Sequence, residues 1–238
     1  ACPNMMLNTI VADELKQFAD TLEKADDFKS TLNRLIKETI REHKRILFNG
    51  NNYAPEWVAE AEKRGLLNLP GTVDCLPYYI REENIALFER HGVLSRAEVH
   101  ARYEIELENY YKQLHIEALT MLDMAKTEIL PAAVGYMRDL AAEIASKQAV
   151  GAGASFENDL LKKLSALSDD LYAQTGKLEQ AAENAPAGGD VLAAARYYHD
   201  AVLSAMEKVR GPADRIESLV GSGFWPYPTY GKLLFSVV

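Results

Sequence analysis

The sequence predicts an all-α protein, and two observations carry that prediction. Apolar residues recur at alternating spacings of four and three over 95–147, 158–185 and 190–220, which places them on one face of a helix. No stretch alternates apolar and polar residues as a half-buried strand does, and no repeat of fixed period occurs. We therefore expect residues 95–220 to form an elongated antiparallel bundle of three long helices.

Residues 1–48 predict a helical hairpin. Apolar residues recur with helical spacing over 7–22 and again over 28–47. Asn4 is placed to cap the first helix and the pair Asp26-Asp27 suits the start of the second, because short polar side chains there accept from unpaired amide groups. The following Asn49-Gly50-Asn51-Asn52 is expected to stop the second helix.

Residues 49–94 are expected to hold two short helices and an ordered loop. One helix is expected over 56–64, after Pro55 at a favoured first-turn position, and the other over 82–90. Between them, residues 66–79 carry two prolines, a glycine and no sustained period. This composition favours an apolar loop packed on the helices.

Local signals mark the course of the long helices. Ser95 and Glu98 form a capping box that opens the first of them. Pro131 lies inside that helix and cannot donate to the carbonyl of Thr127, so we expect a kink there and not an end, because the apolar spacing continues beyond it. Gly211-Pro212 is expected to kink the third long helix in the same way. Tight turns are expected at residues 150–154 and 186–189.

Composition and charge restrict the class of function. The 238 residues are 48% hydrophobic and 9% aromatic, which is enough apolar surface for a folded core. The net charge of −9 argues against nucleic acid, whose phosphates are held by clustered Lys and Arg. No apolar run approaches the roughly twenty residues of a membrane-spanning helix. Two cysteines without a C-x-x-C pair favour a cytoplasmic protein, and a start at Ala1 on a helical pattern is typical of a fragment of a longer chain.

The sequence predicts no catalytic, cofactor-binding or metal-binding residue. The Glu-x-x-His motif of di-metal bundles is absent, because none of the five histidines has a glutamate three residues before it. His100, Glu104 and Glu108 share a face near Arg96, which we interpret as a solvent-facing ladder of ion pairs. No glycine-rich loop fits a nucleotide-binding fingerprint. Cys75, in an apolar stretch, is expected to be a buried small residue and not a nucleophile.

The aromatic and proline-rich tail, residues 221–238, is the strongest functional hint. Aromatic side chains with a polar tip are favoured at interfaces, so the candidate interface residues are Phe224, Trp225, Tyr227 and Tyr230. The alternative, that the tail docks on its own bundle, is equally open.

Several separated strings, in one order along the chain, resemble the C-terminal region of type III glutamine synthetases, the long-chain bacterial form of the enzyme. The resemblance runs from the first residue to the last. The strings are Pro3 to Ala12, Glu42 to Ile46, Phe48 to Tyr53, Glu60 to Leu66, Asn109-Tyr110, Ile116 to Met121, Ile129 to Ala132 and Trp225 to Tyr230.

The resemblance implies glutamate–ammonia ligase chemistry in the parent enzyme. ATP would phosphorylate the side-chain carboxylate of glutamate, ammonia would displace the phosphate, and Mg²⁺ or Mn²⁺ would neutralise the charge between nucleotide and substrate. The family's metal, nucleotide and glutamate ligands belong to a catalytic barrel upstream, and none of those motifs occurs here. No catalytic residue is therefore carried over, no cofactor is expected in this chain, and the chain alone is expected to form no glutamine.

The resemblance also implies a domain organisation and partners. Residues 1–48 correspond to the closing helices of the catalytic domain, and the remainder to a helical C-terminal domain. The implied partners are the rest of the glutamine synthetase chain and a homo-oligomer of stacked hexameric rings, with assembly or regulation as the role of this domain. Two alternatives stay open. Loops 49–53 or 69–79 could reach a neighbouring active site, or the chain could be an independent module that docks another protein through its tail.

Overall fold

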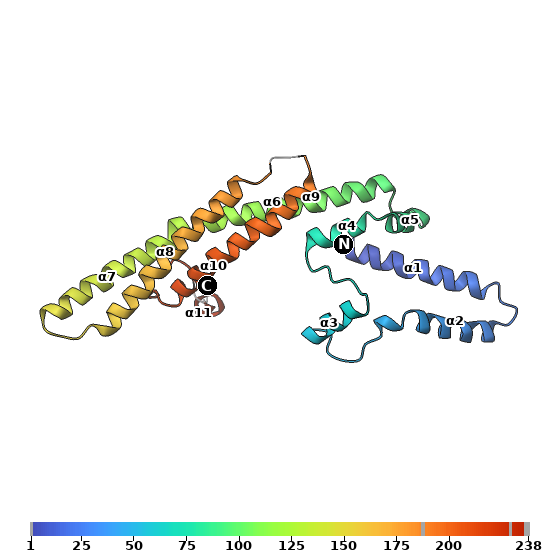
Figure 1. Cartoon of the computed structure of the whole chain (residues 1–238), viewed down its shortest axis with the longest axis horizontal. Helices are drawn as coiled ribbons and strands as arrows, with labels where there is room; N and C mark the ends of the chain where they lie inside the picture. Colours follow the sequence, from blue (N-terminus) through green and yellow to red (C-terminus); the bar gives the residue numbers. More distant parts are fainter. Residues whose placement is uncertain (1, 187–188, 229, 236–238) are drawn as a thin grey trace. The chain divides into compact units, whose positions relative to one another are not determined.

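The computed structural model describes residues 2–186, 189–228 and 230–235. Every regular element among them is a helix, which confirms the all-α class (Figure 1). The chain divides into two compact units, Ala1–Glu106 and Leu107–Val238. Helix α6, Arg96–Met124, begins in the first unit and continues into the second.

The first unit is built around a small apolar cluster made by α5, α6 and the segments that flank them. Its elements are α1 (Cys2–Leu22), α2 (Phe28–Glu42), the 3-10 turn η1 (Lys44–Ile46), α3 (Pro55–Lys63), α4 (Thr72–Tyr79), α5 (Glu82–Arg90) and the start of α6. The buried members of the cluster are Tyr79, Ile85, Phe88, Leu94 and Val99, and Met5 and Met6 of α1 pack against them.

Local signals at several helix ends are confirmed. The Asp27 carboxylate accepts from the amides of Lys29 and Ser30 and caps α2. The Ser95–Glu98 capping box forms in both directions, with distances of 2.8 Å from the Ser95 amide to Glu98 Oε2 and 3.4 Å from the Glu98 amide to Ser95 Oγ. Gly65 follows α3 with a φ of 74°, a conformation that favours glycine.

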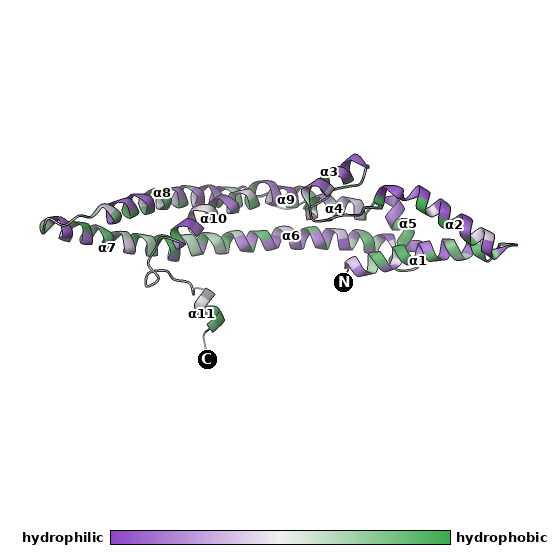
Figure 2. Cartoon of the chain, turned by 90° about the horizontal axis from the view of Figure 1, so that it is seen from below, coloured by the Kyte–Doolittle hydropathy of each residue, from purple (hydrophilic) through white to green (hydrophobic). Residues whose placement is uncertain are grey.

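The N-terminal hairpin forms, but its apolar residues are not covered by the chain. Helices α1 and α2 are in contact, yet α2 has no buried residue. α1 packs on the cluster of the first unit through Met5, Met6 and the buried Thr9, and so turns its other apolar positions outward. We call these exposed residues of the two helices the N-terminal apolar face: Leu7, Ile10, Val11, Leu15, Phe28, Ile36 and Ile40. The ribbons of α1 and α2 both carry hydrophobic positions, drawn in green (Figure 2).

Three expectations for the first unit were wrong. Asn4 does not cap α1, because the helix already begins at Cys2. The second helix ends at Glu42, and a 3-10 turn takes the residues up to Ile46. Residues 72–79 form helix α4 where a loop was expected. Only Val73 and Tyr79 of α4 are buried and Pro77 lies inside it, so this short helix shows no apolar period.

The second unit is organised around helix α8. Its elements after α6 are the π-helical turn η2 (Ala125–Ile129), α7 (Leu130–Ala149), α8 (Ser155–Glu183), α9 (Val191–Tyr197), the π-helical turn η3 (Tyr198–Leu203), α10 (Ser204–Glu217) and α11 (Tyr230–Phe235). Helix α8 contacts both α7 and α10. Its buried residues follow the four–three spacing seen in the sequence, and they are Leu160, Leu164, Leu167, Leu171, Thr175 and Leu178, with Ser168 beside them.

Side chains of α6, η2, α7, η3 and α10 complete one apolar core with α8. Tyr198, at the first position of η3, is buried in it, and its hydroxyl lies 3.0 Å from Nδ1 of His115 on α6. The neighbouring Tyr197 donates its hydroxyl to the carbonyl of Ala181 on α8 at 2.9 Å. These two tyrosines therefore join three helices through polar contacts at the edge of the core.

The long helices continue at both of their prolines, Pro131 and Pro212. Before Pro131 the helix continues, as expected, and passes through the π-helical turn η2, in which the Leu130 amide donates to the carbonyl of Ala125. A π-helical turn is an established way to accommodate a lost amide donor within a helix. Helix α10 runs through Pro212, so the kink expected there stays a prediction, and the irregular turn of the third long helix lies upstream at Tyr198–Leu203. The turn after α7 is confirmed, with Gly151 at a φ of 75°; of the expected turn at 186–189, residues 187 and 188 lie outside the described residues.

We predict that Leu171→Ala destabilises the second unit by about 2–5 kcal/mol, since it leaves a cavity in a fully buried seam. Urea unfolding followed by circular dichroism measures the change. The control is Val134→Ala, which truncates a largely exposed side chain on α7 and should shift the midpoint little. Equal losses in both variants would contradict the central place of α8.

Candidate functional site

The predicted interface residues of the tail lie against the second unit. The Phe224 ring is 5.2 Å from that of Tyr136, and the rings of Trp225 and Tyr227 meet edge to face at 5.9 Å. All three tail residues are partly buried and pack on the core of this unit. The side chain of Tyr230 lies outside the described part of the chain. The interface assignment itself stays a prediction.

Two buried polar atoms of the tail, Trp225 Nε1 and the Tyr227 hydroxyl oxygen, have no hydrogen-bond partner among the described residues. The Trp225 indole N–H is buried with no acceptor among the described residues. The buried Tyr227 hydroxyl lies beside the Glu128 carboxylate without meeting hydrogen-bond geometry, and its pKa is raised by burial and then by the charge of Glu128. An unpaired buried donor costs free energy, and the Trp225 indole is such a donor among the described residues.

Side chains typical of metal or nucleophilic sites are scattered. Nowhere in the described residues do three His, Cys, Asp or Glu side chains gather into a group that could hold a metal ion. The expected ladder on α6 is only partly formed, because Arg96 reaches across to Glu82 in a bidentate pair at 2.6 Å while Glu108 pairs with Lys112 at 2.7 Å. The burial of Cys75 was wrongly predicted: it is exposed, because the eight-residue helix α4 buries only Val73 and Tyr79.

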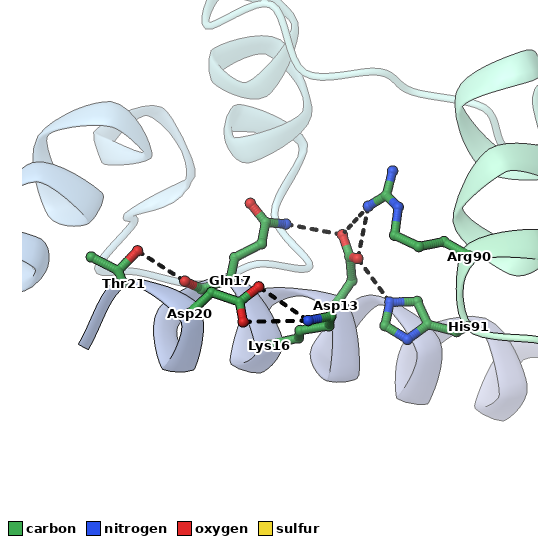
Figure 3. Close-up of polar contacts among 7 residues, drawn as sticks. All are labelled: Asp13, Lys16, Gln17, Asp20, Thr21, Arg90 and His91. Atoms are coloured by element: carbon green, nitrogen blue, oxygen red, sulfur yellow. Dashed lines mark hydrogen bonds and ion pairs between the residues drawn. The ribbon is translucent and has the colours of Figure 1, made fainter. Parts of the chain in front are cut away.

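An ion network joins α1 to the end of α5. The Asp13 carboxylate accepts from Arg90 Nη1 at 2.8 Å and from Gln17 Nε2 at 2.9 Å, and its Oδ1 lies 2.8 Å from Nε2 of His91 (Figure 3). The Asp13 side chain is 14% exposed and that of His91 17%. The hydrogen bond from His91, followed by the contacts with Arg90, lowers the pKa of Asp13. The network therefore forms a polar clasp between α1 and the end of α5, in addition to the packing of Met5 and Met6 on the apolar cluster.

Arg64 ties together the segments before and after the loop that follows α2. Its Nη1 donates to the carbonyl of Leu47 at 2.9 Å and to that of Arg45 at 3.3 Å, while its Nε donates to Glu60 at 2.7 Å. The guanidinium also lies 5.6 Å from the ring centroid of Trp57. A planar group with five donors can serve several acceptors at once, which a lysine cannot.

The loop held by Arg64 presents a tyrosine to solvent. Phe48 stacks on Trp57 with centroids 4.2 Å apart, and Gly50 lies so close to Phe48 that an added Cβ would stand 2.6 Å from its ring. The Asn51 side chain accepts from the amide of Tyr53 at 3.0 Å. Tyr53 is 98% exposed. A loop that presents an almost fully exposed aromatic residue is a candidate contact point for another polypeptide.

An apolar pocket of about 300 Å³ continues the N-terminal apolar face into the body of the first unit. Residues of α1, α4 and α5 line it, including Met6, Ile10, Leu76 and Leu87. Ile10 belongs to both the face and the pocket. The pocket and the face therefore adjoin at Ile10.

The polar clasp and the Arg64 anchor were not found by sequence reasoning. Asp13 and Arg90 are 77 positions apart, so no spacing rule relates them. The one available signal was the i,i+4 pair of Glu60 and Arg64, which predicts a helical salt bridge but not the contacts of Arg64 with main-chain carbonyls.

We predict that Asp13→Asn lowers the stability of the first unit at neutral pH and that the loss shrinks in acid. Because the folded-state pKa of Asp13 lies below its ordinary value of 3.8, the stabilisation is fully present above that value and disappears as the pH falls through the lower folded pKa. Urea midpoints of wild type and variant at pH 7 and at decreasing pH measure it. Asp20→Asn, which removes only the exposed pair with Lys16, is the control. A loss for Asp13→Asn that does not depend on pH would contradict this assignment.

We predict that Arg64→Lys loosens the loop while leaving α3 folded. A lysine cannot hold the carbonyls of Arg45 and Leu47 together with Glu60, so the amide of Leu47 should exchange hydrogen about fivefold faster. Hydrogen exchange read by mass spectrometry or NMR measures this. Lys63→Gln changes a neighbouring charge and should leave the exchange unchanged; acceleration in both variants would contradict the anchor role.

Comparison with known proteins gives one consistent family. Residues 31–148 match the model described as glutamine synthetase C-terminal domain. A glutamine synthetase of Butyrivibrio fibrisolvens is 42% identical over 214 residues, which are 89% of this chain and 31% of that protein. A type-3 glutamine synthetase of Dictyostelium discoideum is 31% identical over 98% of this chain and 33% of its own length. A glutamine synthetase of Bacteroides fragilis is 25% identical over 99% of this chain and 34% of its own length.

The chain spans about a third of the length of these curated relatives. The matched residues 31–148 run from within α2 to the end of α7 and include Arg64 and Tyr53. These matches confirm the resemblance to the C-terminal region of type III glutamine synthetases. The chain therefore belongs to the glutamine synthetase family and carries the family's C-terminal domain.

Proposed function

We propose that this chain is a non-catalytic helical region of a type III glutamine synthetase and that it supports the assembly or regulation of a cytoplasmic homo-oligomer. The parent reaction would join ammonia to glutamate with ATP as phosphoryl donor. The observation that carries the proposal is the N-terminal apolar face together with its pocket, an apolar surface that this chain leaves in water. A soluble protein rarely leaves such a continuous surface uncovered.

Residues 1–48 are the natural place for contact with the rest of the enzyme. Burying one side chain such as Leu15, Phe28 or Ile40 is worth about 1.5–3 kcal/mol relative to leaving it in water. Several of them on one face would stabilise a contact with a large partner. The part of the relatives that lies outside the matched region, about two thirds of their length, could supply that partner. Residues 1–48 would then be the closing helices of the catalytic domain.

ATP and the divalent ion belong, in this proposal, to the part of the enzyme outside this chain. The donor set of the described residues does not fit a di-metal or nucleotide–metal centre, because three ligating side chains never converge there. We therefore derive no catalytic step from these residues. None of the helices in the described part is long and apolar enough to cross a membrane.

A second candidate role rests on Tyr53. Arg64 holds the main chain at Arg45 and Leu47, just before the loop 49–53, and Tyr53 of that loop is almost fully exposed. A loop of this kind could reach a neighbouring subunit and shape its active site. Such a role predicts altered kinetics with an intact oligomer after Tyr53→Ala, whereas an assembly role predicts loss of the oligomer.

We predict that Leu15→Glu impairs the full-length enzyme but not this chain alone. Leu15 is 61% exposed here, so a carboxylate at this position should leave the unfolding of the 238-residue chain unchanged. In the full enzyme it would place a charge in a covered apolar contact and lower the yield of soluble oligomer, measured by light scattering. Thr21→Glu, an equal charge at an exposed position of the same helix, is the control. A full enzyme that tolerates both substitutions would overturn the proposed contact.

A further inference from the structure

A pocket in the first unit is lined by three basic side chains and one apolar side chain. Its volume is about 410 Å³, and its lining residues are Lys44, Arg45, Leu47 and Arg64. Lys44 and Arg45 lie on the 3-10 turn η1, and Arg64 directly follows α3. The fold therefore brings cations from two separate segments to one place.

The positive charges of this pocket exceed the negative charges paired with them. Arg64 pairs with Glu60 at 2.7 Å, whereas the side chains of Lys44 and Arg45 have no hydrogen-bond or ion-pair partner among the described residues. Three cations and one paired carboxylate leave an excess of two positive charges, in a chain whose net charge is −9. Like charges held close together repel one another, so an anion bound between them is stabilised.

The guanidinium of Arg64 is held in position before any ligand arrives. Its Nη1 donates to the carbonyls of Arg45 and Leu47, its Nε donates to Glu60, and the group lies 5.6 Å from the ring centroid of Trp57. The Arg64 side chain is 28% exposed. These contacts leave Nη2 without an acceptor among the described residues. The same contacts fix the main chain of η1, which carries the other two cations. A ligand therefore meets a site that is already ordered, which lowers the entropic cost of binding.

The charge of the pocket favours a phosphate group. A phosphate monoester carries about −1.5 to −2 charge near pH 7, which matches the excess of two positive charges. A single carboxylate would leave one cation without a partner. Arginine donates to phosphate oxygens through its planar fork of N–H groups, and lysine binds them as a point charge. Leu47 is 57% exposed and supplies an apolar wall for the organic part of a ligand.

We propose that the pocket formed by Lys44, Arg45, Leu47 and Arg64 binds a phosphate group, either free or carried by a small organic molecule. The inference goes beyond the proposed function and uses no residue of the N-terminal apolar face. Failure of the phosphate site would therefore leave the proposed contact of that face untouched, and the reverse also holds.

The test is a titration of the 238-residue chain with inorganic phosphate, followed by NMR. Sodium chloride replaces phosphate in the control titration at equal ionic strength, because salt screens exposed charges without binding at one site. The amides of residues 44–47 and the Nε–H of Arg64 should shift saturably with phosphate and not with chloride. Shifts that fail to saturate, or that are equal in the two titrations, would overturn the proposal.

Substitution of the unpaired cations tests the residues themselves. Lys44→Gln combined with Arg45→Gln should weaken phosphate binding at least about tenfold, since two charge-assisted contacts are lost. Both side chains are exposed, so folding should be unaffected, as circular dichroism verifies. Lys63→Gln removes a cation of α3 that does not line the pocket and is the control. Unchanged binding in the double variant, or an equal loss in the control, would contradict the assignment.

Glycerol phosphate separates the two sources of the phosphate group. Tighter binding of glycerol phosphate than of inorganic phosphate would assign the site to an organic phosphate whose carbon atoms contact Leu47. Equal or weaker binding would assign it to free phosphate. Both results support a phosphate site, and the absence of saturable binding by either compound overturns it.

Discussion

The apolar seam of α8 is the contact on which the second unit depends. Its buried residues follow the four–three spacing closely enough that one helix face meets α7 and α10 at once. Thr175 and Ser168 are the polar residues buried on this face of α8. Thr175 satisfies its hydroxyl within the helix by donating to the carbonyl of Tyr172 at 2.7 Å, whereas the buried Ser168 hydroxyl has no hydrogen-bond partner among the described residues.

The first unit is held differently, and the difference bears on function. Its apolar cluster is small, and the polar clasp between Asp13, Arg90 and His91 helps to hold α1 on α5. The larger part of the apolar surface of α1 and α2 faces outward. We propose that other protein covers this surface. The relatives are about three times as long as this chain, and the part of them outside the matched region is the candidate for that cover.

Sequence spacing predicted the features that depend on neighbours along the chain. The Ser95–Glu98 capping box, the limits of α5 and the seam of α8 all follow from residues three or four apart. Helix α4 was missed because it is short, contains Pro77 and buries only two of its residues. Periodicity identified the apolar positions of α1 and α2, but it cannot show whether the same chain supplies their cover.

The contacts that distinguish the candidate sites are long-range, and for that reason they could not be predicted. Arg64 donates to the carbonyl of Leu47, and main-chain acceptors leave no trace in the residue types. The clasp joins positions 77 and 78 residues apart. The aromatic tail was singled out as a candidate interface, and that assignment stays a prediction, because its two possible partners, its own bundle and another protein, require the same side chains. Among the described residues, Phe224, Trp225 and Tyr227 pack on the core of the second unit.

The most direct test of the central claim, that the N-terminal apolar face is covered by the rest of the enzyme, is hydrogen exchange of α1 and α2 in two contexts. The amides of both helices should exchange markedly more slowly in the full-length enzyme than in the 238-residue chain, while the amides of α8 exchange alike in both. Equal exchange of α1 and α2 in the two contexts would contradict the account.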